Sequence, residues 1–297
     1  MMLTNLFLVV AGALAAESKP KVEWSAPESF LGEGDYMAHV VLTWSEDIEP
    51  VPAWLITHSA FTVNGKPLVE RDDSKIKWLG SGSMTVDLNL GPLLRKSGYE
   101  GKDFKLGYAK EFLGGEEKEV RVMQAAEKGL DFMKMPVEEL SKYHVIMSTN
   151  QGDMEIEFWP DVAPNHVRNF LDLSYTGFYD GKTFHRVIPG FMIQGGDPTG
   201  TGTGSGPRML KAEFNDKKHL PGVLSMARSS DPNSASCQFF ICHKTASSLD
   251  KQYSGFGQLV SGLEVVDKIV NVKRNSNDKP FDPQTIKKCT VVKSGGK

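Results

Sequence analysis

The stretch FHRVIPGFMIQGGD, residues 184–197, decides the fold of the second half of this 297-residue chain. It consists of short apolar segments separated by glycine, a pattern typical of β-strands joined by tight turns. Two further blocks of the same kind follow, GVLSMAR at 222–228 and SCQFFIC at 236–242. Together these blocks predict a domain built mainly from β-strands.

A hairpin and two helices surround these blocks. Residues 145–158 form two runs of strand formers around a turn, and the second run alternates apolar with acidic residues. One helix is expected to begin at Pro164, because proline suits a first helical turn. A second is expected after a capping box at Ser261–Glu264. Many strands with two helices predict a closed antiparallel barrel whose ends are covered by the helices.

The first half of the chain has a different organisation. Residues 22–123 contain several short alternating runs, and Asn64-Gly65 supplies the turn of a two-residue hairpin. This predicts a β-sandwich domain of unknown role. Residues 124–142 are rich in charge and are expected to form a linker, so that the second domain occupies 143–297.

The amino terminus resembles an export signal. An apolar run at 6–16 ends in small residues, and it is too short for a bilayer span of about 20 residues. We expect residues 1–16 to be a signal peptide cleaved near Ala15-Ala16, which would send the protein to the periplasm or outside the cell. No Lys or Arg precedes the run, and a disordered tail or a buried strand is the alternative.

Composition excludes several functions. The formal net charge of −3 is too small to favour nucleic acid or an anionic membrane as a partner. The seven histidines are scattered and the cysteine spacing fits no zinc site, so we expect no metal and no cofactor. The three cysteines do not form a disulfide framework, although Cys289 can pair with Cys237 or Cys242 in an oxidising compartment.

In their order and spacing, the three blocks resemble the signature blocks of the cyclophilin family of prolyl isomerases, over residues 143–292. The resemblance implies an eight-stranded barrel with a hydrophobic groove that binds proline-containing polypeptides, and it makes Arg186 the catalytic residue. The substrate-binding residues that it implies are Phe191, Met192, Gln194, Ala227, Arg228, Gln238, Phe240, Leu249 and Tyr253. The pocket for the proline ring would be formed by Phe191, Met192, Phe240 and Leu249.

The chemistry of the reaction suits an arginine. Rotation about a peptide bond costs about 18–20 kcal/mol, because the nitrogen shares its lone pair with the carbonyl group. At 90° of twist the prolyl nitrogen becomes a hydrogen-bond acceptor, so a donor beside it binds the twisted form better than the planar form. Arg186 offers permanently charged donors in a rigid plane. We expect Ala227 and Arg228 to offer backbone groups to the substrate, with a solvated surface side chain as the alternative for Arg228.

Several positions depart from the family pattern or carry weaker signals. Ser248 stands where many eukaryotic members carry Trp, which predicts weak binding of cyclosporin, and Tyr253 stands where many carry His. The glycine-rich stretch 200–206 is expected to be a loop rather than a phosphate site. His185 should be structural, because it points to the other face from its neighbour Arg186. No Ser/His/Asp triad is indicated.

Two other functions remain open from the sequence. The second domain can be a binding module that grips proline-containing segments without turnover. Alternatively, the first domain can have the main role, as an adhesion, chaperone or dimerisation module to which an isomerase is tethered. Retention of Arg186 favours the enzyme.

Overall fold

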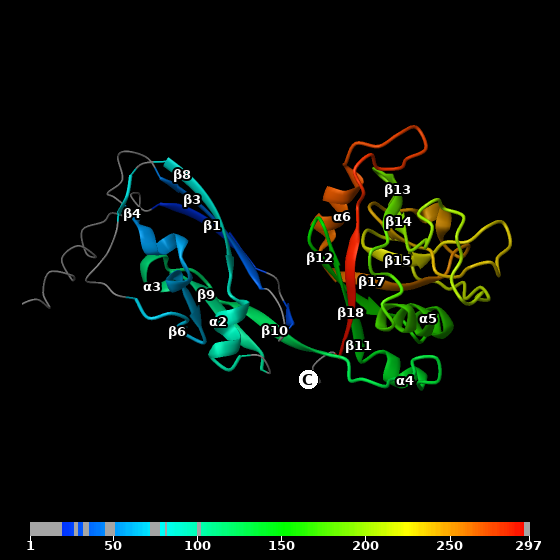
Figure 1. Ribbon diagram of the computed structural model, residues 1–297, viewed down its shortest axis with the longest axis horizontal. Helices are drawn as coiled ribbons and strands as arrows, with labels where there is room; N and C mark the ends of the chain where they lie inside the picture. The colour runs from blue at the N-terminus through cyan, green and yellow to red at the C-terminus, as the bar shows by residue number, and fades with distance from the viewer. Residues whose placement is uncertain are drawn as a thin grey trace, which may run out of the picture. The chain divides into compact units, whose positions relative to one another are not determined.

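The chain divides at Met123/Gln124 into two compact units, which are described one at a time (Figure 1). The computed structural model describes residues 20–26, 29–31, 36–44, 51–71, 78–80, 82–99 and 102–293. The predicted signal peptide at 1–16 lies outside these residues. Within them, no helix is both long and apolar enough to cross a membrane.

Three sets of strands make up most of the first unit. One antiparallel sheet has the order β1 (Lys21–Ser25), β3 (Met37–Trp44), β8 (Gly82–Asn89). A second set contains β6 (Lys66–Pro67), β5 (Phe61–Val63), β9 (Phe104–Tyr108), β10 (Lys118–Ala125) and β2 (Ser29–Leu31), and β4 (Val51–Pro52) pairs with β7 (Trp78–Leu79). Short helical segments connect them: η1 (Ala53–Ile56), η2 (His58–Ala60), α2 (Gly91–Lys96) and α3 (Lys110–Leu113).

Strand alternation explains the core of the first unit. Along β3, Ala38, Val40, Leu42 and Trp44 are buried, and they share one hydrophobic cluster with residues of β5, β9 and β10. The predicted two-residue hairpin is confirmed: Asn64 and Gly65 both have positive φ and join β5 to β6. The structure thus gives sheets around one core, and the β-sandwich predicted for residues 22–123 stays a prediction.

The second unit contains eight antiparallel strands. They are β11 (Tyr143–Thr149), β12 (Asp153–Phe158), β13 (Phe184–Ile188), β14 (Met192–Gly195), β15 (Val223–Met226), β16 (Phe239–Cys242), β17 (Gly255–Ser261) and β18 (Ile286–Lys293). They are hydrogen-bonded in the order β13-β14-β16-β15-β17-β12-β11-β18. The helical segments are α4 (Val137–Leu140), α5 (Pro164–Tyr175), η4 (Ser247–Leu249) and α6 (Leu263–Val270).

The prediction of a closed barrel is wrong, because the hydrogen-bonded strand order does not close into a ring. β13 and β18 lie at the two ends of the strand order, and the described residues join them by an isolated bridge, Thr183 to Thr285, instead of a strand pair. Around this bridge, Gly181 donates to the Ile286 carbonyl oxygen, Ile286 donates to that of Lys182, and Phe184 donates to that of Gln284.

The two predicted helices are confirmed, with one correction. α5 begins at Pro164, as expected, but the capping box predicted for α6 does not form. Gly262 caps α6 with φ of 92° and no side-chain bond, and a Cβ atom there would lie 2.5 Å from the Asp153 carbonyl oxygen. A glycine is therefore required where the sequence pattern predicted a serine cap.

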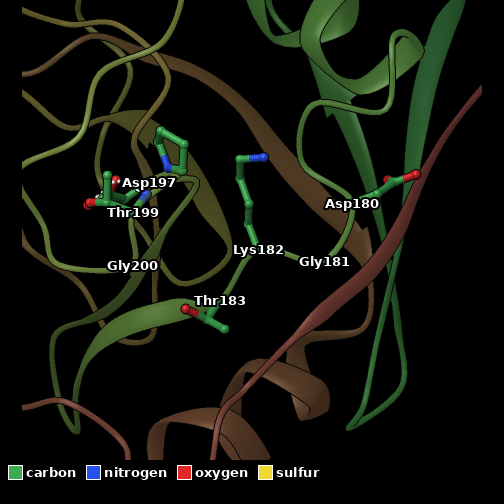
Figure 2. A pocket seen from close by; sticks show the side chains of 8 residues that line it. Asp180, Gly181, Lys182, Thr183, Asp197, Thr199 and Gly200 are labelled. Carbon is green, nitrogen blue, oxygen red and sulfur yellow. Dashed lines mark hydrogen bonds between the residues drawn. The ribbon is translucent and has the colours of Figure 1, made fainter.

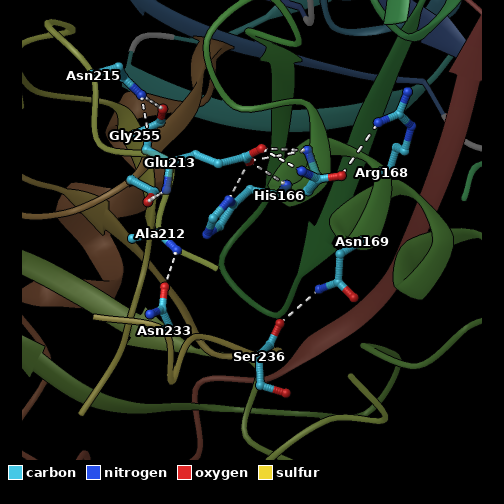
Figure 3. Close-up of polar contacts among 11 residues, drawn as sticks. His166, Arg168, Asn169, Ala212, Glu213, Asn215, Asn233, Ser236 and Gly255 are labelled. Carbon is cyan, nitrogen blue, oxygen red and sulfur yellow. Dashed lines mark hydrogen bonds and ion pairs between the residues drawn. The ribbon is translucent and has the colours of Figure 1, made fainter. Parts of the chain in front are cut away.

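Helix α5 is fixed by a residue far from it in sequence (Figure 3). The Glu213 carboxylate accepts hydrogen bonds from the backbone N–H groups of Asn165 and His166 at the start of the helix. It also lies 2.6 Å from Nδ1 of the buried His166 ring. Glu213 thus supplies the cap that α5 lacks locally.

The core of the second unit is rich in aromatic residues. The buried ring of Phe170 on α5 lies 4.9 Å from the Tyr179 ring and 5.2 Å from the Phe239 ring, between centroids. Residues 124–142, predicted to be a linker, contribute to this core, because Phe132 and Leu140 are fully buried in it. Because the segment is rich in charged residues, its composition did not indicate that these two side chains are buried in the core.

Candidate active site

Arg186 is exposed on β13, whereas its neighbour His185 is buried. The register shifts at this point of the strand, and Arg186 pairs with Gln194 on β14. The Arg186 guanidinium donates a hydrogen bond from Nη1 to Oε1 of Gln194 at 3.4 Å. The side chain therefore points out of the barrel core, in the orientation that contact with a substrate requires.

A chain of amides continues from Arg186. Gln194 donates from Nε2 to Oε1 of Gln238 at 3.0 Å, and Gln238 donates in turn to the carbonyl oxygens of Gly202 and Gly204. The sequence assigned Gln194 and Gln238 to the substrate, whereas in the structure they also hold each other and Arg186. Their joint effect is to restrict the guanidinium to one region of the surface.

The glycine-rich loop is organised by a buried carboxylate. Asp197 is 1% exposed and accepts hydrogen bonds from the backbone N–H groups of Thr199, Thr201, Gly202 and Gly204. Burial raises the pKa of Asp197, but these hydrogen bonds outweigh it and lower the pKa to about 2. The loop N–H groups are bound to a residue of the protein, which supports the interpretation of 200–206 as a loop and not a phosphate site.

The apolar residues predicted for the groove gather in a cluster separate from the core, which we call the Met192 cluster. Its buried members are Met192, Val223, Phe240, Cys242 and Ala246, and its partly exposed members are Trp159, Ile188, Phe191, Ala227, Leu249 and Tyr253. Pairing of β14 with β16 places Met192 opposite Cys242. Six predicted site residues are thus brought together, and five residues that were not predicted for the site join them.

A polar chain lies behind Phe240. The His219 ring stacks on Phe240 with centroids 6.1 Å apart, its Nδ1 lies 3.2 Å from Oδ1 of Asp250, and its Nε2 lies 3.0 Å from Oγ of Ser225. Burial lowers the pKa of His219, and Asp250 offsets part of that effect. Ser225 is 0% exposed and cannot meet a substrate, so the three residues support Phe240 instead of forming a nucleophilic triad.

Several predicted contacts take a different form. The N–H group of Ala227, expected to meet substrate, donates to the carbonyl oxygen of Gln238 at 2.9 Å. The Arg228 guanidinium donates to the backbone carbonyl groups of Gln252 and Ser229, so it is not the free surface side chain given as the alternative, and the contact of its backbone with substrate stays a prediction. Ser248 is exposed in η4, and Tyr253 contacts Phe240 edge to face.

A polar pocket, drawn in Figure 2, shares no residue with the Met192 cluster. Its lining consists of residues 180–183 and 197–200, and none of them is a predicted site residue. Lys182, which lines it, donates from Nζ to the carbonyl oxygen of Phe178 and lies over the ring of that residue. Its amine is therefore already bound within the protein.

Cys237, Cys242 and Cys289 are buried free thiols, and burial raises the pKa of Cys242 to about 12. A protonated buried thiol reacts slowly. Among the residues that the structure describes, no three His, Cys, Asp or Glu side chains converge as metal ligands would.

Comparison with known proteins identifies one family. Residues 144–291 match the family model of the cyclophilin-type peptidyl-prolyl cis-trans isomerases. A peptidyl-prolyl cis-trans isomerase of Synechococcus elongatus is 47% identical over 136 residues, which are 43% of this chain and 93% of the relative. The ppi1 isomerase of Schizosaccharomyces pombe is 41% identical over 155 residues, 50% of this chain and 99% of the relative.

Solved structures and longer relatives add two findings. A cyclophilin-type isomerase of Cryptosporidium parvum, crystallised with the dipeptide Ala-Pro, is 37% identical with a TM-score of 0.48, over 52% of this chain and 99% of that one. In three other relatives the matched segment makes up only 25% to 30% of the protein. The same domain thus occurs both alone and within longer chains.

Proposed function

Because this chain belongs to the family of cyclophilin-type peptidyl-prolyl cis-trans isomerases, we propose that Arg186 accelerates rotation about Xaa–Pro bonds bound at the Met192 cluster. The isomerase domain occupies the second unit. The observation that carries the proposal is the placement of an exposed guanidinium, held by Gln194, beside a partly exposed apolar cluster. Ile188, two residues after Arg186 on β13, is a member of that cluster.

Differential binding supplies the physical basis of the proposed reaction. A planar Xaa–Pro bond presents no lone pair on nitrogen, whereas the twisted bond does, so the Arg186 hydrogen bond forms fully only in the transition state. Apolar side chains around the proline ring exclude water and strengthen that hydrogen bond. A rate gain of about 10⁵ needs about 7 kcal/mol, which one charged hydrogen bond, desolvation and positioning can share. No proton transfer is involved.

An exchange assay tests the activity directly. The purified protein is added to a peptide with one Ala-Pro bond, and NMR exchange spectroscopy measures the interconversion of the cis and trans forms. We expect an interconversion far faster than the tens to hundreds of seconds of the uncatalysed reaction. If the peptide signals shift but the exchange is no faster, the protein binds the peptide without catalysing isomerisation, and the alternative of a binding module holds.

The rate should change little between pH 6.5 and 8. Arg186 stays charged throughout this range, and burial lowers the pKa of both His185 and His219, which moves the titration of the two rings away from this range. We therefore expect kcat/KM to vary by less than about twofold, measured by the same exchange assay in buffers of equal ionic strength. A bell-shaped profile within this window would contradict the mechanism, because it would require an acid or base near the bond.

Cyclosporin should bind weakly, and Ser248→Trp should improve its binding. Position 248 is exposed in η4, so a Trp side chain can extend over the surface beside Leu249 without disturbing buried residues. Burial of part of its 150–250 Å² is worth about 1–2 kcal/mol, or roughly five- to thirtyfold in Kd. Calorimetric titration of both proteins measures the gain, and Ser247→Trp, also exposed in η4, provides the control.

We propose further that the protein is exported and assists folding outside the cytoplasm. The support is the apolar run at 6–16 with small residues at its end. Slow Xaa–Pro isomerisation limits the folding of many chains, which gives an exported isomerase a task. Mass spectrometry of the protein purified from its own cells tests this, because export with cleavage predicts a mature chain that begins near residue 17. An intact Met1 on the purified protein would contradict it.

A further inference from the structure

We propose that Arg228 is a positioning residue of the isomerase site, which fixes Tyr253 against the Met192 cluster. This inference rests on the proposed function, since it assigns a role within the same site. Arg228 lies in the loop after β15, two residues beyond Met226, and Tyr253 lies in the loop before β17. The two residues therefore come from different loops that meet at the margin of the cluster.

The guanidinium joins two loops through their backbones. Nε and Nη2 donate to the carbonyl oxygen of Gln252 at 3.3 and 3.1 Å, and Nη1 donates to the carbonyl oxygens of Ser229 at 2.8 Å and Ser230 at 3.4 Å. Four of the five N–H groups of an arginine are thus bound to the protein itself. Little donor capacity remains for a substrate, which argues for a positioning role over direct binding.

The same guanidinium covers an aromatic wall of the site. Its central carbon lies 4.6 Å from the centroid of the Tyr253 ring and 5.8 Å from that of Phe214. Tyr253 in turn meets Phe240 with centroids 5.8 Å apart and ring planes at 80°. A line of contacts therefore runs from Arg228 through Tyr253 to Phe240, a buried member of the Met192 cluster.

The turn that contains Tyr253 needs a stabilising contact such as the hydrogen bonds from Arg228. Gln252 and Tyr253 donate their N–H groups to the Leu249 carbonyl oxygen, and Lys251 within the turn has φ of 60°, a left-handed conformation that is unfavourable for a residue with a side chain. The Arg228 guanidinium donates a hydrogen bond to the carbonyl group of the next residue, Gln252. Loss of these hydrogen bonds would therefore let Tyr253 move away from Phe240 in the Met192 cluster.

A double-mutant cycle tests the proposed route through Tyr253. We expect Arg228→Ala to lower kcat/KM by about five- to twentyfold, mainly by raising KM, because the wall of the substrate site becomes mobile. In a Tyr253→Ala background the same substitution should change kcat/KM by less than about twofold. Arg228→Lys should not restore activity, since an ammonium group cannot form the planar set of bonds. Arg274→Ala, in the loop before β18, serves as the control.

NMR signals of the tyrosine rings provide a second measurement, which does not depend on isomerase activity. With ring-labelled tyrosine in the complete protein, Arg228→Ala should broaden or split the Tyr253 signals, and Arg274→Ala should leave them unchanged. If the wild type fails to isomerise the Ala-Pro peptide, the proposed function falls, while these signals still decide the role of Arg228. Should Arg228→Ala fail to fold, Arg228→Met, which keeps the aliphatic stem, replaces it in both measurements.

Three results would overturn the inference. An equal loss of activity from Arg228→Ala with and without Tyr253 would show that the arginine acts by another route. A loss confined to peptides with acidic residues, and diminished by salt, would show that Arg228 binds the substrate by charge. Unchanged Tyr253 ring signals in Arg228→Ala would also contradict it.

Discussion

Replacement of Arg186 by alanine should lower kcat/KM for an Ala-Pro peptide by about 10- to 100-fold, with the fold intact and peptide binding partly kept. A hydrogen bond to a charged group contributes about 1.5–3 kcal/mol, and each 1.36 kcal/mol corresponds to a factor of ten in rate. The side chain is exposed, so its removal leaves no cavity in the core. NMR exchange measures the rate, and titration of the same peptide measures Kd.

The comparison of rate with affinity is the informative part of this experiment. If Arg186 acts on the twisted bond, kcat falls far more than Kd rises, because the planar substrate never forms the full hydrogen bond. Arg186→Lys keeps the charge but not the planar donors, so it should recover only part of the rate. A proportional loss of affinity and rate, or an unchanged rate in Arg186→Ala, would remove the physical basis of the mechanism.

The members of the site could be predicted from sequence because they lie in three short blocks whose strand alternation is regular. Met192 and Gln194 on β14 pair with Cys242 and Phe240 on β16, so a groove on one face follows from the pattern and the family resemblance. Which side chains hold Arg186 was not predictable, since the chain from Gln194 to Gln238 depends on amide orientation across 44 residues of sequence.

The missed features involve contacts between residues that are distant in sequence. His219 contacts Asp250, which lies 31 residues later in the sequence. Glu213 contacts His166 at the start of α5, 47 residues earlier. Neither contact has a local signature, and a buried histidine cannot be told from an exposed one by its neighbours. A pairing seen only in three dimensions also decides whether the eight strands close into a barrel, which the alternation of each strand does not determine.

Alternation was misleading at one edge of the first unit. Met84 on β8 alternates with polar residues, a pattern that predicts burial, yet it is 37% exposed. β8 ends the three-stranded sheet, with β3 as its partner in the described residues, so fewer neighbours cover its apolar face. Periodicity gives the two faces of a strand, but the position of the strand in its sheet determines how deeply either face is buried.

Replacement of Asp197 by asparagine should lower the free energy of unfolding of the second unit by about 2–4 kcal/mol at pH 7. The carboxylate accepts from four backbone N–H groups and from the hydroxyl group of Thr199. An amide presents one oxygen and one NH₂ group, so at least two of these part-buried donors lose their bond to the carboxylate, at about 1–2 kcal/mol each. Urea denaturation of the full chain, followed by signals of the second unit, measures the loss.

The pH dependence of stability distinguishes a charged acceptor from a merely polar one. The pKa of Asp197 is about 2 in the folded protein, below its ordinary value of 3.8, so the folded state resists protonation more than the unfolded state does. The contribution is complete above pH 3.8 and disappears as pH falls towards 2, which removes about 2 kcal/mol from the wild type. Asp197→Asn should lack this acid-dependent loss.

Asp231→Asn is the matched control, because that exposed carboxylate accepts from the backbone N–H group of Asn233 in a similar loop. Equal acid sensitivity of wild type and Asp197→Asn would show that the loop beside Gln238 is held by something other than this charge.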